Sequence, residues 1–439
     1  MAEKIQTVGI YTLGCKVNQY ESEAIAEELL KNGLSIDSPS NPCDAYIINT
    51  CTVTAESDRK ARQFIRRAIS KNPDAYVVVT GCFAQVSPES IAAIEGVDAV
   101  IGNGNKLEAA TAVINMLKAQ KAKTSPTIKV GDIESSPFEP MQISSFERTR
   151  AYVKIEDGCE NRCTYCIIPS ARGKVRSKPM DEVLDEVRTL TKNGCREIVL
   201  TGIETASYGK DLENTDLATL LEEVDKIEGI GRVRLGSLDP SLIKQDFVKR
   251  ISALKSLAPH FHLSLQSGSD RILAKMKRKY NSTQAMRAIE LLRENIKDVK
   301  FTTDVIVGFP TETEEDFTES VDFVRKARFL MVHVFPYSSR KGTPACSMQG
   351  QIAGEEKTRR VHILSDAAQE TRKALLDEVC ASEKICEVLF ETHENGYAYG
   401  HTPDFLEVAV KSDVPLHAVT KKVKFTHNNG NICFGDIVD

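Results

Sequence analysis

Segments with the apolar pattern of a buried strand alternate with amphipathic helical segments along most of this 439-residue chain. Alternation of this kind favours parallel sheets covered by helices, because consecutive parallel strands need a crossover connection that a helix supplies. A first block of alternation covers residues 5–118, and a second, longer block begins at Ala151. The sequence therefore predicts an α/β protein that contains two separate parallel-sheet units.

The two blocks predict sheets of different shape. In the first block, strand patterns end near Leu13, Asn49 and Thr80, which indicates an open parallel sheet. The second block has strand patterns with helical stretches between them, which indicates a partial (βα)6 barrel, because eight such units are needed for closure. These patterns lie at residues 152–155, 198–201, 233–236, 261–265, 303–308 and 332–336.

The remaining segments divide the chain into domains. Residues 119–144 are rich in Lys, Ser, Pro and Glu and lack periodicity, so we expect a linker there. The second parallel unit is then expected over residues 145–375. Residues 376–439 contain three short β-type runs, at residues 386–390, 405–410 and 421–425, separated by Gly, Asn and Pro, a pattern typical of a small all-β barrel.

The composition indicates in which cellular compartment this chain is expected to function. No stretch approaches the roughly 18 uninterrupted apolar residues of a membrane-spanning helix, and the N-terminus lacks the apolar segment of a signal peptide. We therefore expect a cytoplasmic protein without a membrane partner. The formal net charge of -5 gives no overall attraction to nucleic acid, so any binding of nucleic acid would need local basic surfaces.

Twelve cysteines are unusual for a chain expected in the reducing cytoplasm, where clustered cysteines indicate metal binding or catalysis. Cys159, Cys163 and Cys166 form a tight Cys-x3-Cys-x2-Cys loop directly after the first strand of the second block. Three thiolates can hold three corners of a 4Fe-4S cluster and leave the fourth iron open. Zinc is the alternative, but a closed zinc site needs four ligands, and the next cysteine, Cys195, lies beyond a predicted helix.

Three further cysteines, Cys15, Cys51 and Cys82, each follow the end of a predicted strand in the first block. Because parallel strands end at the same edge of a sheet, the three thiols can converge there. The spacing is equally compatible with three unrelated buried cysteines, since cysteine is a common small core residue. From spacing alone, both interpretations remain open.

The motifs around these cysteines resemble a known family. A Cys-x3-Cys-x-aromatic-Cys loop at the opening of a βα barrel is similar to the radical S-adenosylmethionine (SAM) superfamily. Several motifs are similar, more narrowly, to the methylthiotransferases, and the resemblance extends to a C-terminal module similar to a TRAM domain. These motifs are Gly14–Glu21 (GCKVNQYE), Asn49–Val53 (NTCTV), Thr80–Cys82 (TGC), Pro169–Ser177 (PSARGKVRS), His262–Asp270 (HLSLQSGSD) and Asp304–Glu312 (DVIVGFPTE).

The motif that begins at Gly14 resembles the branch of the family that acts on N6-threonylcarbamoyladenosine (t6A) beside the tRNA anticodon. The branches that act on isopentenyladenosine or on a ribosomal protein usually have another residue in place of Lys16. One departure is Thr311, where family members commonly have glycine before the glutamate that is retained here as Glu312. The resemblance implies a methylthiotransferase acting at C2 of t6A37, with isopentenyladenosine tRNA or a ribosomal protein as alternative substrates. A zinc-stabilised RNA-binding protein is the alternative from another class.

The resemblance also implies the cofactors, which are two 4Fe-4S clusters and SAM. One cluster, which cleaves SAM and generates a 5′-deoxyadenosyl radical, would be held by Cys159, Cys163 and Cys166. The other, which delivers sulfur, would be held by Cys15, Cys51 and Cys82. Tyr165 would lie near the adenine of SAM by analogy with the family.

Polar residues at predicted strand ends are candidates for contacts with SAM, because βα barrels place their active sites there. Capping of a loop is the alternative role for each of them, and position alone favours neither. The candidates are Glu204, Gln266, Ser267 and Asp304.

The implied partners are the tRNA anticodon stem-loop and a one-electron donor similar to flavodoxin or ferredoxin. Any single basic run is more often a solvated face than a phosphate site, but several runs together on an acidic chain favour local contacts with the tRNA backbone. The small β-barrel is expected to add RNA contacts. The basic runs are Arg172, Lys174, Arg176 and Lys178; Lys275, Lys277, Arg278 and Lys279; and Lys421, Lys422 and Lys424.

Overall fold

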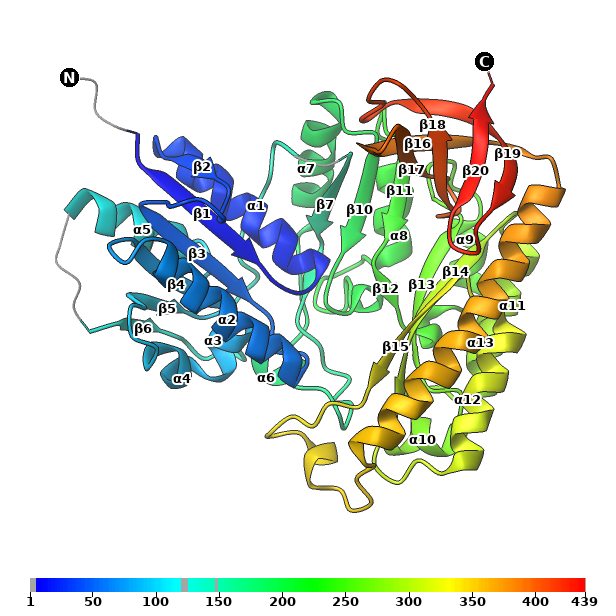
Figure 1. Cartoon of the computed structure of the whole chain (residues 1–439), viewed down its shortest axis with the longest axis horizontal. Helices are drawn as coiled ribbons and strands as arrows, with labels where there is room; N and C mark the ends of the chain where they lie inside the picture. Colours follow the sequence, from blue (N-terminus) through cyan, green and yellow to red (C-terminus); the bar gives the residue numbers. More distant parts are fainter. Residues whose placement is uncertain (1–4, 120–124, 147–148, 439) are drawn as a thin grey trace.

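The computed structural model describes residues 5–119, 125–146 and 149–438. The chain forms an N-terminal parallel sheet, a central partial barrel and a C-terminal closed β-barrel, in that order (Figure 1). The predicted α/β fold class, with its partial barrel and its small β-barrel, is confirmed. Within the described ranges, no helix is both long and apolar enough to span a membrane.

The N-terminal sheet is entirely parallel, with the strand order β2-β1-β3-β4-β5-β6. Its central strand β3 is buried at every position, as expected for a parallel strand covered by helices on both faces. Strand β6 lies within the segment expected to be a linker. The elements are β1 (Thr7–Thr12), α1 (Lys16–Lys31), β2 (Ser35–Asp37), β3 (Ala45–Thr50), α2 (Ala55–Lys71), β4 (Tyr76–Gly81), α3 (Cys82–Val86), α4 (Pro88–Ala92), β5 (Ala99–Ile101), α5 (Glu108–Ala119) and β6 (Thr127–Lys129).

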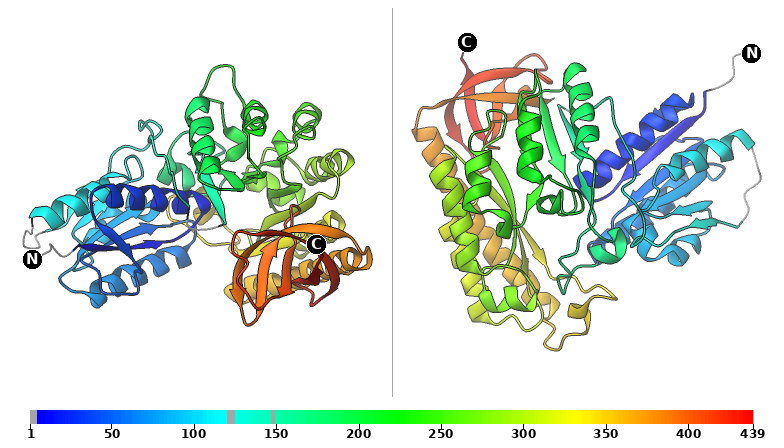
Figure 2. Two further views of the ribbon diagram at one scale, coloured as in Figure 1. Left: turned by 90° about the horizontal axis from the view of Figure 1, so that it is seen from above. Right: turned by 180° about the vertical axis from the view of Figure 1, so that it is seen from behind.

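Helices cover both faces of this sheet. Helices α1 and α5 share one apolar cluster, to which they contribute Ile25 and Val113, whereas α2 and α3 contribute Ile65 and Phe83 to the cluster on the other face. Helix α1 also packs against the central domain, where its Tyr20 joins the core of the partial barrel. The two parallel units therefore share one helix at their boundary, and Figure 2 shows them side by side.

The central domain is a curved wall of parallel strands with helices on its outer side. Strands β7, β10 and β11 form one sheet and β12 to β15 form the next, and only Gly236 separates β11 from β12. The antiparallel pair β8–β9 closes the base of the cysteine loop. The elements are β7 (Arg150–Lys154), β8 (Glu156–Asp157), α6 (Ile168–Arg172), β9 (Arg176–Ser177), α7 (Met180–Lys192), β10 (Glu197–Thr201), η1 (Thr205–Ser207), α8 (Leu217–Asp225), β11 (Arg232–Leu235), β12 (Ser237–Leu238), η2 (Pro240–Leu242), α9 (Gln245–Ile251), β13 (His260–Gln266), α10 (Asp270–Lys275), α11 (Ser282–Asn295), β14 (Lys300–Val307), α12 (Glu314–Ala327), β15 (Met331–Pro336) and η3 (Pro344–Ser347).

A long helix, α13 (Gly354–Ala381), runs past β15 and α12 and leads into the C-terminal barrel (Figure 1). The barrel closes in the order β16-β17-β18-β20-β19. The sequence pattern predicted three of these strands but not β17 and β20, each of which contains a glycine that interrupts the apolar alternation. The strands are β16 (Ile385–Glu394), β17 (Tyr397–His401), β18 (Glu407–Lys411), β19 (Thr420–Asn428) and β20 (Cys433–Ile437).

The C-terminal barrel docks where the strands of the central domain begin. The ring of Phe405 stacks on His260, the first residue of β13, with the ring centroids 4.4 Å apart. Arg234 donates hydrogen bonds to the carbonyl oxygens of Thr402 and Pro403, both at 2.9 Å. The barrel therefore covers the end of the wall opposite the cysteine loop, which leaves the carboxyl ends of the strands for chemistry.

Glu197 makes this docking sensitive to acid. Burial alone would raise the pKa of its carboxyl, but Arg234, Arg150 and Arg232 lower the pKa to about 2 from the ordinary 4.5. A carboxyl with a depressed folded-state pKa stabilises the fold fully above about pH 4.5, and that stabilisation disappears as the pH falls towards 2. The shift corresponds to about 3 kcal/mol.

We therefore predict that, at pH 7, the wild-type protein unfolds at a higher urea concentration than Glu197→Gln. This difference in unfolding midpoint should shrink as the pH falls from 5 to 3. The exposed Glu89 is the matched control, because Glu89→Gln should follow wild type at every pH. A gap between wild type and Glu197→Gln that does not change with pH would contradict the ion-pair explanation.

Candidate active site

The loop that carries Cys159, Cys163 and Cys166 is held in one shape by the backbone around it. Gly158 has a φ of +92°, and a Cβ at this position would lie 1.8 Å from the carbonyl oxygen of Lys174, so only glycine fits. The amide of Cys159 donates to the carbonyl of Gly173 at 3.0 Å, and the amide of Cys166 donates to the carbonyl of Cys163 at 3.1 Å. The local turn therefore presents the three thiols together.

A cavity of about 300 Å³ opens over this loop. Its volume is at the lower end of the range for sites that bind small molecules. Residues from three parts of the chain line it: the cysteine loop, the carboxyl ends of the barrel strands, and Val53 and Thr54, which come shortly after Cys51 in the N-terminal domain. The lining side chains that can bind a metal or form hydrogen bonds are Cys159, Asn161, Cys163, Tyr165, Cys166, Glu204, Gln266, Arg278 and Asp304.

Four of the five predicted SAM contacts line this cavity, namely Tyr165, Glu204, Gln266 and Asp304. Gln266 has a left-handed φ of 70° at a register shift between β13 and β14. The structure does not bring Ser267 to the cavity. Its hydroxyl is fully buried, 3.2 Å from the hydroxyl of Ser320, and accepts a hydrogen bond from the amide of Ser269, so Ser267 caps its own loop.

Within the part of the chain that the structure describes, one carboxyl oxygen of Glu204 is left without a hydrogen-bond partner in the wall of the cavity. Asn161 donates to its Oε2 at 2.8 Å, whereas the buried Oε1 has no hydrogen-bond partner among the described residues. Burial and the nearby charge of Asp239 raise the pKa of Glu204 to about 7. A cationic group bound at Oε1 would restore the ionised form, and the α-amino group of SAM is such a cation. The cavity therefore fits SAM at this wall.

The three thiols of the cysteine loop are suited to bind the irons of a cluster. Burial raises the pKa of Cys159 and of Cys166 to about 12, so both stay protonated at neutral pH until a metal displaces the proton. No three His, Cys, Asp or Glu side chains in the described ranges converge on a single metal-ion position. A cubane does not need such convergence, because each thiolate binds a separate iron.

The structure also brings Cys15, Cys51 and Cys82 together, at the edge where the adjacent strands β1, β3 and β4 end. Gly14 has a φ of +104°, and a Cβ there would lie 2.8 Å from Cβ of Cys51, so the turn before α1 runs directly against that cysteine. Burial, then the neighbouring Cys82 and Cys15, raise the pKa of Cys51 to about 11. The three cysteines are therefore neighbours, as their positions at strand ends allowed.

A buried ion network joins the two sets of cysteines, and Arg172 lies at its centre. Its Nε donates to Sγ of Cys82 at 3.3 Å, and its Nη1 donates to Glu21 at 2.6 Å and to Asp157 at 3.1 Å. Asp157 comes two residues before Cys159. One side chain thus contacts a cysteine of the first set and a carboxylate next to the second set. Lys106 and Lys154 also pair with Glu21.

These contacts correct one expectation about RNA binding. Of the predicted basic run, Arg172, Arg176 and Lys178 are buried, and Lys178 pairs with Glu186 at 2.5 Å. Only Lys174 is exposed. The expectation that this run contacts the tRNA backbone was wrong for three of its four members, because the sequence pattern does not show that carboxylates more distant along the chain neutralise them.

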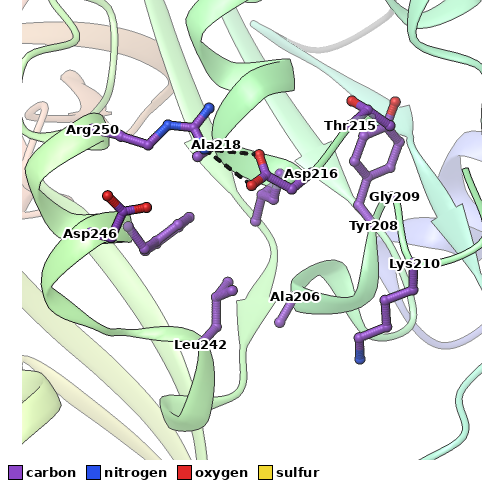
Figure 3. Close-up of a pocket in the computed structure, with 12 residues that line it drawn as sticks. Ala206, Tyr208, Gly209, Lys210, Thr215, Asp216, Ala218, Leu242, Asp246 and Arg250 are labelled. Atoms are coloured by element: carbon purple, nitrogen blue, oxygen red, sulfur yellow. Dashed lines mark hydrogen bonds and ion pairs between the residues drawn. The ribbon is translucent and has the colours of Figure 1, made fainter. Parts of the chain in front are cut away.

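A second cavity, of about 220 Å³, lies on the outer side of the barrel between η1, α8 and α9 (Figure 3). Its polar wall is largely self-neutralised, since Arg250 pairs with Asp216 at 3.0 Å. Its lining contains neither cysteines nor any predicted SAM contact. The chemistry of the molecule therefore centres on the cavity above the cysteine loop.

Comparison with known proteins agrees with this geometry. Residues 153–324 match the Radical SAM superfamily, and residues 7–102 match a family described as "Uncharacterized protein family UPF0004". The solved structure of the radical SAM methyltransferase TsrM from Kitasatospora setae has a TM-score of 0.56 and 16% identity, and the alignment covers 78% of this chain and 77% of TsrM. This likeness concerns the fold. Fold, cysteine loop and family match together define a radical SAM enzyme, which uses a 4Fe-4S cluster and SAM.

Proteins whose sequences align with most of this chain identify its family within the radical SAM enzymes. The threonylcarbamoyladenosine tRNA methylthiotransferase MtaB of Bacillus subtilis is 40% identical, over 95% of this chain and 93% of the relative. The protein of the same name from Aquifex aeolicus is 39% identical, over 84% and 90%. A tRNA-2-methylthio-N(6)-dimethylallyladenosine synthase from Aquifex aeolicus is 33% identical, over 98% of both chains. This chain belongs to the radical SAM methylthiotransferase family.

We predict that Glu204→Gln weakens SAM binding by about tenfold to 100-fold, because a charge-assisted hydrogen bond contributes roughly 1.5–3 kcal/mol. Equilibrium dialysis of SAM against cluster-loaded enzyme measures the effect. Glu213→Gln is the matched control, since Glu213 lies exposed on the segment that follows the same strand, outside the cavity. Equal SAM affinity in both variants would remove Glu204 from the binding site.

Proposed function

We propose that this chain is a tRNA methylthiotransferase that adds a methylthio group to C2 of the adenine of t6A37, next to the anticodon. The observation that carries the substrate is the full-length similarity to relatives named for this activity, at 40% identity for the Bacillus subtilis protein. The relative named for dimethylallyladenosine is less similar, at 33%. The geometry supports the reaction class, because two sets of three cysteines lie at one domain boundary.

Each set of cysteines has a separate task in this proposal. Cys159, Cys163 and Cys166 hold the cluster that binds SAM, and Cys15, Cys51 and Cys82 hold a second 4Fe-4S cluster. When bound, the first cluster supplies the electron that cleaves SAM, and the second supplies the sulfur. Val53 and Thr54 support this division, because they come shortly after Cys51 in the chain and line the SAM cavity.

The other residues of the chain bind, orient and exclude water. Glu204 accepts a hydrogen bond from the α-amino group of SAM. Gln266 and Asp304 contact the polar parts of SAM from the neighbouring strand ends. Tyr165, which lines the same cavity and lies between Cys163 and Cys166 in the sequence, would contact the adenine of SAM. The buried contacts around Arg172 keep the two domains closed over the cavity, and a closed cavity protects a radical from water.

RNA contacts come from the C-terminal barrel in this proposal. Four rings form a row on its outer surface: Tyr399 lies 6.4 Å from Tyr397, Tyr397 lies 6.0 Å from Phe434, and Phe434 stacks on His427 at 4.8 Å. The exposed Lys422 lies on β19, the strand that carries His427. Aromatic rings beside cations are the usual surface for unpaired RNA bases. The electron comes from a flavodoxin-like or ferredoxin-like protein.

The substrate is tested with reconstituted enzyme, SAM and a chemical reductant, on anticodon stem-loops that differ only at position 37. We predict methylthio product from the t6A37 stem-loop and none from stem-loops with isopentenyladenosine or unmodified adenosine. Ribosomal proteins from the same organism are the third substrate. Product from isopentenyladenosine or from a ribosomal protein, with none from t6A, would contradict the substrate and retain the enzyme class.

The division of labour predicts that two matched substitutions differ in their 5′-deoxyadenosine formation. Cys51→Ala should still form 5′-deoxyadenosine but yield no methylthio product, and its iron content should fall by roughly half, because one of two cubanes is lost. Cys159→Ala should lose both products. Circular dichroism must first show folded protein, since metal binding and folding are coupled. Full methylthio product from Cys51→Ala would show that the sulfur comes from elsewhere.

A further inference from the structure

Each set of cysteines receives one hydrogen bond from an arginine that is distant along the chain. Nε of Arg172 donates to Sγ of Cys82, and Nη1 of Arg278 donates to Sγ of Cys163, both at 3.3 Å. Arg172 ends helix α6, and Arg278 lies in the turn after α10. The same N–H···S contact thus occurs once at each set, from elements that are unrelated in sequence.

Both arginines are shielded from water. The side chain of Arg172 is 0% exposed, and that of Arg278 is 5% exposed. An arginine keeps its charge under such conditions, because its guanidinium does not deprotonate in proteins. Water therefore screens neither positive charge from the adjacent sulfur, and each contact is stronger than the same contact at the surface.

The charges around Arg172 leave a net positive charge next to Cys82. The network contains four cations and two carboxylates. If the nearby Glu139 is counted as a third carboxylate, the cations still exceed the carboxylates by one. A buried excess of this kind needs an anion beside it. The network consists of four cations (Lys106, Lys154, Arg172 and Arg176) and two carboxylates (Glu21 and Asp157).

We propose that Arg172 and Arg278 are positioning residues that each set the reduction potential of one iron–sulfur cluster. Hydrogen bonds to the cluster sulfurs and the net charge around a cluster both determine its potential. A donor N–H and a positive charge stabilise the more negative, reduced state, so each arginine raises the potential of its own cluster. The part of the proposal that concerns Arg172 rests on the proposed second cluster. The part that concerns Arg278 rests only on the cluster of the cysteine loop.

A purely structural role would give a different result. Arg172 joins two domains, and Arg278 donates to the carbonyl of Ser264 and to Asp239, so loss of either could loosen the fold. Loosening changes stability or iron content but does not shift the potential of a cluster that is fully loaded. Arg234 is the matched control, because it is also a buried arginine that joins two domains, through the carbonyl oxygens of Thr402 and Pro403 at 2.9 Å, and it lies at the end of the central domain opposite the cysteines.

The test is an EPR-monitored redox titration of the reconstituted full-length chain. Alanine at Cys159, Cys163 and Cys166 isolates the second cluster, and alanine at Cys15, Cys51 and Cys82 isolates the first. In these backgrounds, Arg172→Gln should lower the potential of the second cluster, and Arg278→Gln that of the first. We expect about a tenfold change in the ratio of oxidised to reduced cluster, which is about 59 mV for one electron.

Conservative variants and the control complete the design. Arg172→Lys and Arg278→Lys keep the charge and should shift the potential less than the glutamine variants do, and Arg234→Gln should shift neither cluster. Unchanged potentials in loaded Arg172→Gln and Arg278→Gln would overturn the proposal, as would an equal shift in Arg234→Gln. If Arg172→Gln does not load a cluster, Arg172→Lys decides that part of the proposal. A wild type with only four irons per chain would instead refute the proposed second cluster, and the Arg278 titration would still decide its own part.

Discussion

The architecture of this protein depends on the buried ion network around Arg172. Charges that leave water are stable only when each meets an opposite charge at good geometry, and removal of one partner from a buried pair typically costs several kcal/mol. The network takes Glu21 from helix α1, Lys106 from the segment before α5, and Lys154 and Asp157 from the central domain. Such a set of partners forms in one relative placement of the two domains, and this placement brings both sets of cysteines to one boundary.

Two independent folds thus supply one reaction site. The open sheet ends three neighbouring strands in cysteines, and the partial barrel presents its own three cysteines on a loop closed by the β8–β9 pair. Val53 and Thr54 reach from the first unit into the cavity of the second. The C-terminal barrel docks at the opposite end through Phe405 and Arg234. The proposed function therefore assigns chemistry and RNA binding to different ends of the central domain.

The sequence predicted the features that depend on local pattern. Apolar runs located β1, β3 and β4 of the first unit and the longer strands of the second, and the Cys-x3-Cys-x2-Cys spacing located the loop, because both signals lie within a few residues. The short strands β2, β5 and β6 were not predicted. Features that depend on distant partners were not predictable. Arg172 and Arg278 read as basic surface residues, since nothing near them in sequence shows that they meet Cys82 and Cys163 across 90 and 115 positions. Ser267 occupied a plausible position, but its hydroxyl accepts a hydrogen bond from the amide of Ser269 in its own loop and contacts the hydroxyl of Ser320 on α12.

The central claim is that this chain places a methylthio group on t6A in tRNA. The most direct measurement is mass spectrometry of the nucleosides of total tRNA from cells with and without the gene. The account predicts that 2-methylthio-t6A disappears on deletion while t6A itself accumulates, that 2-methylthio-isopentenyladenosine is unchanged, and that the gene restores the wild-type pattern. Unchanged 2-methylthio-t6A in the deletion strain, in the absence of a second gene for the same modification, would contradict it.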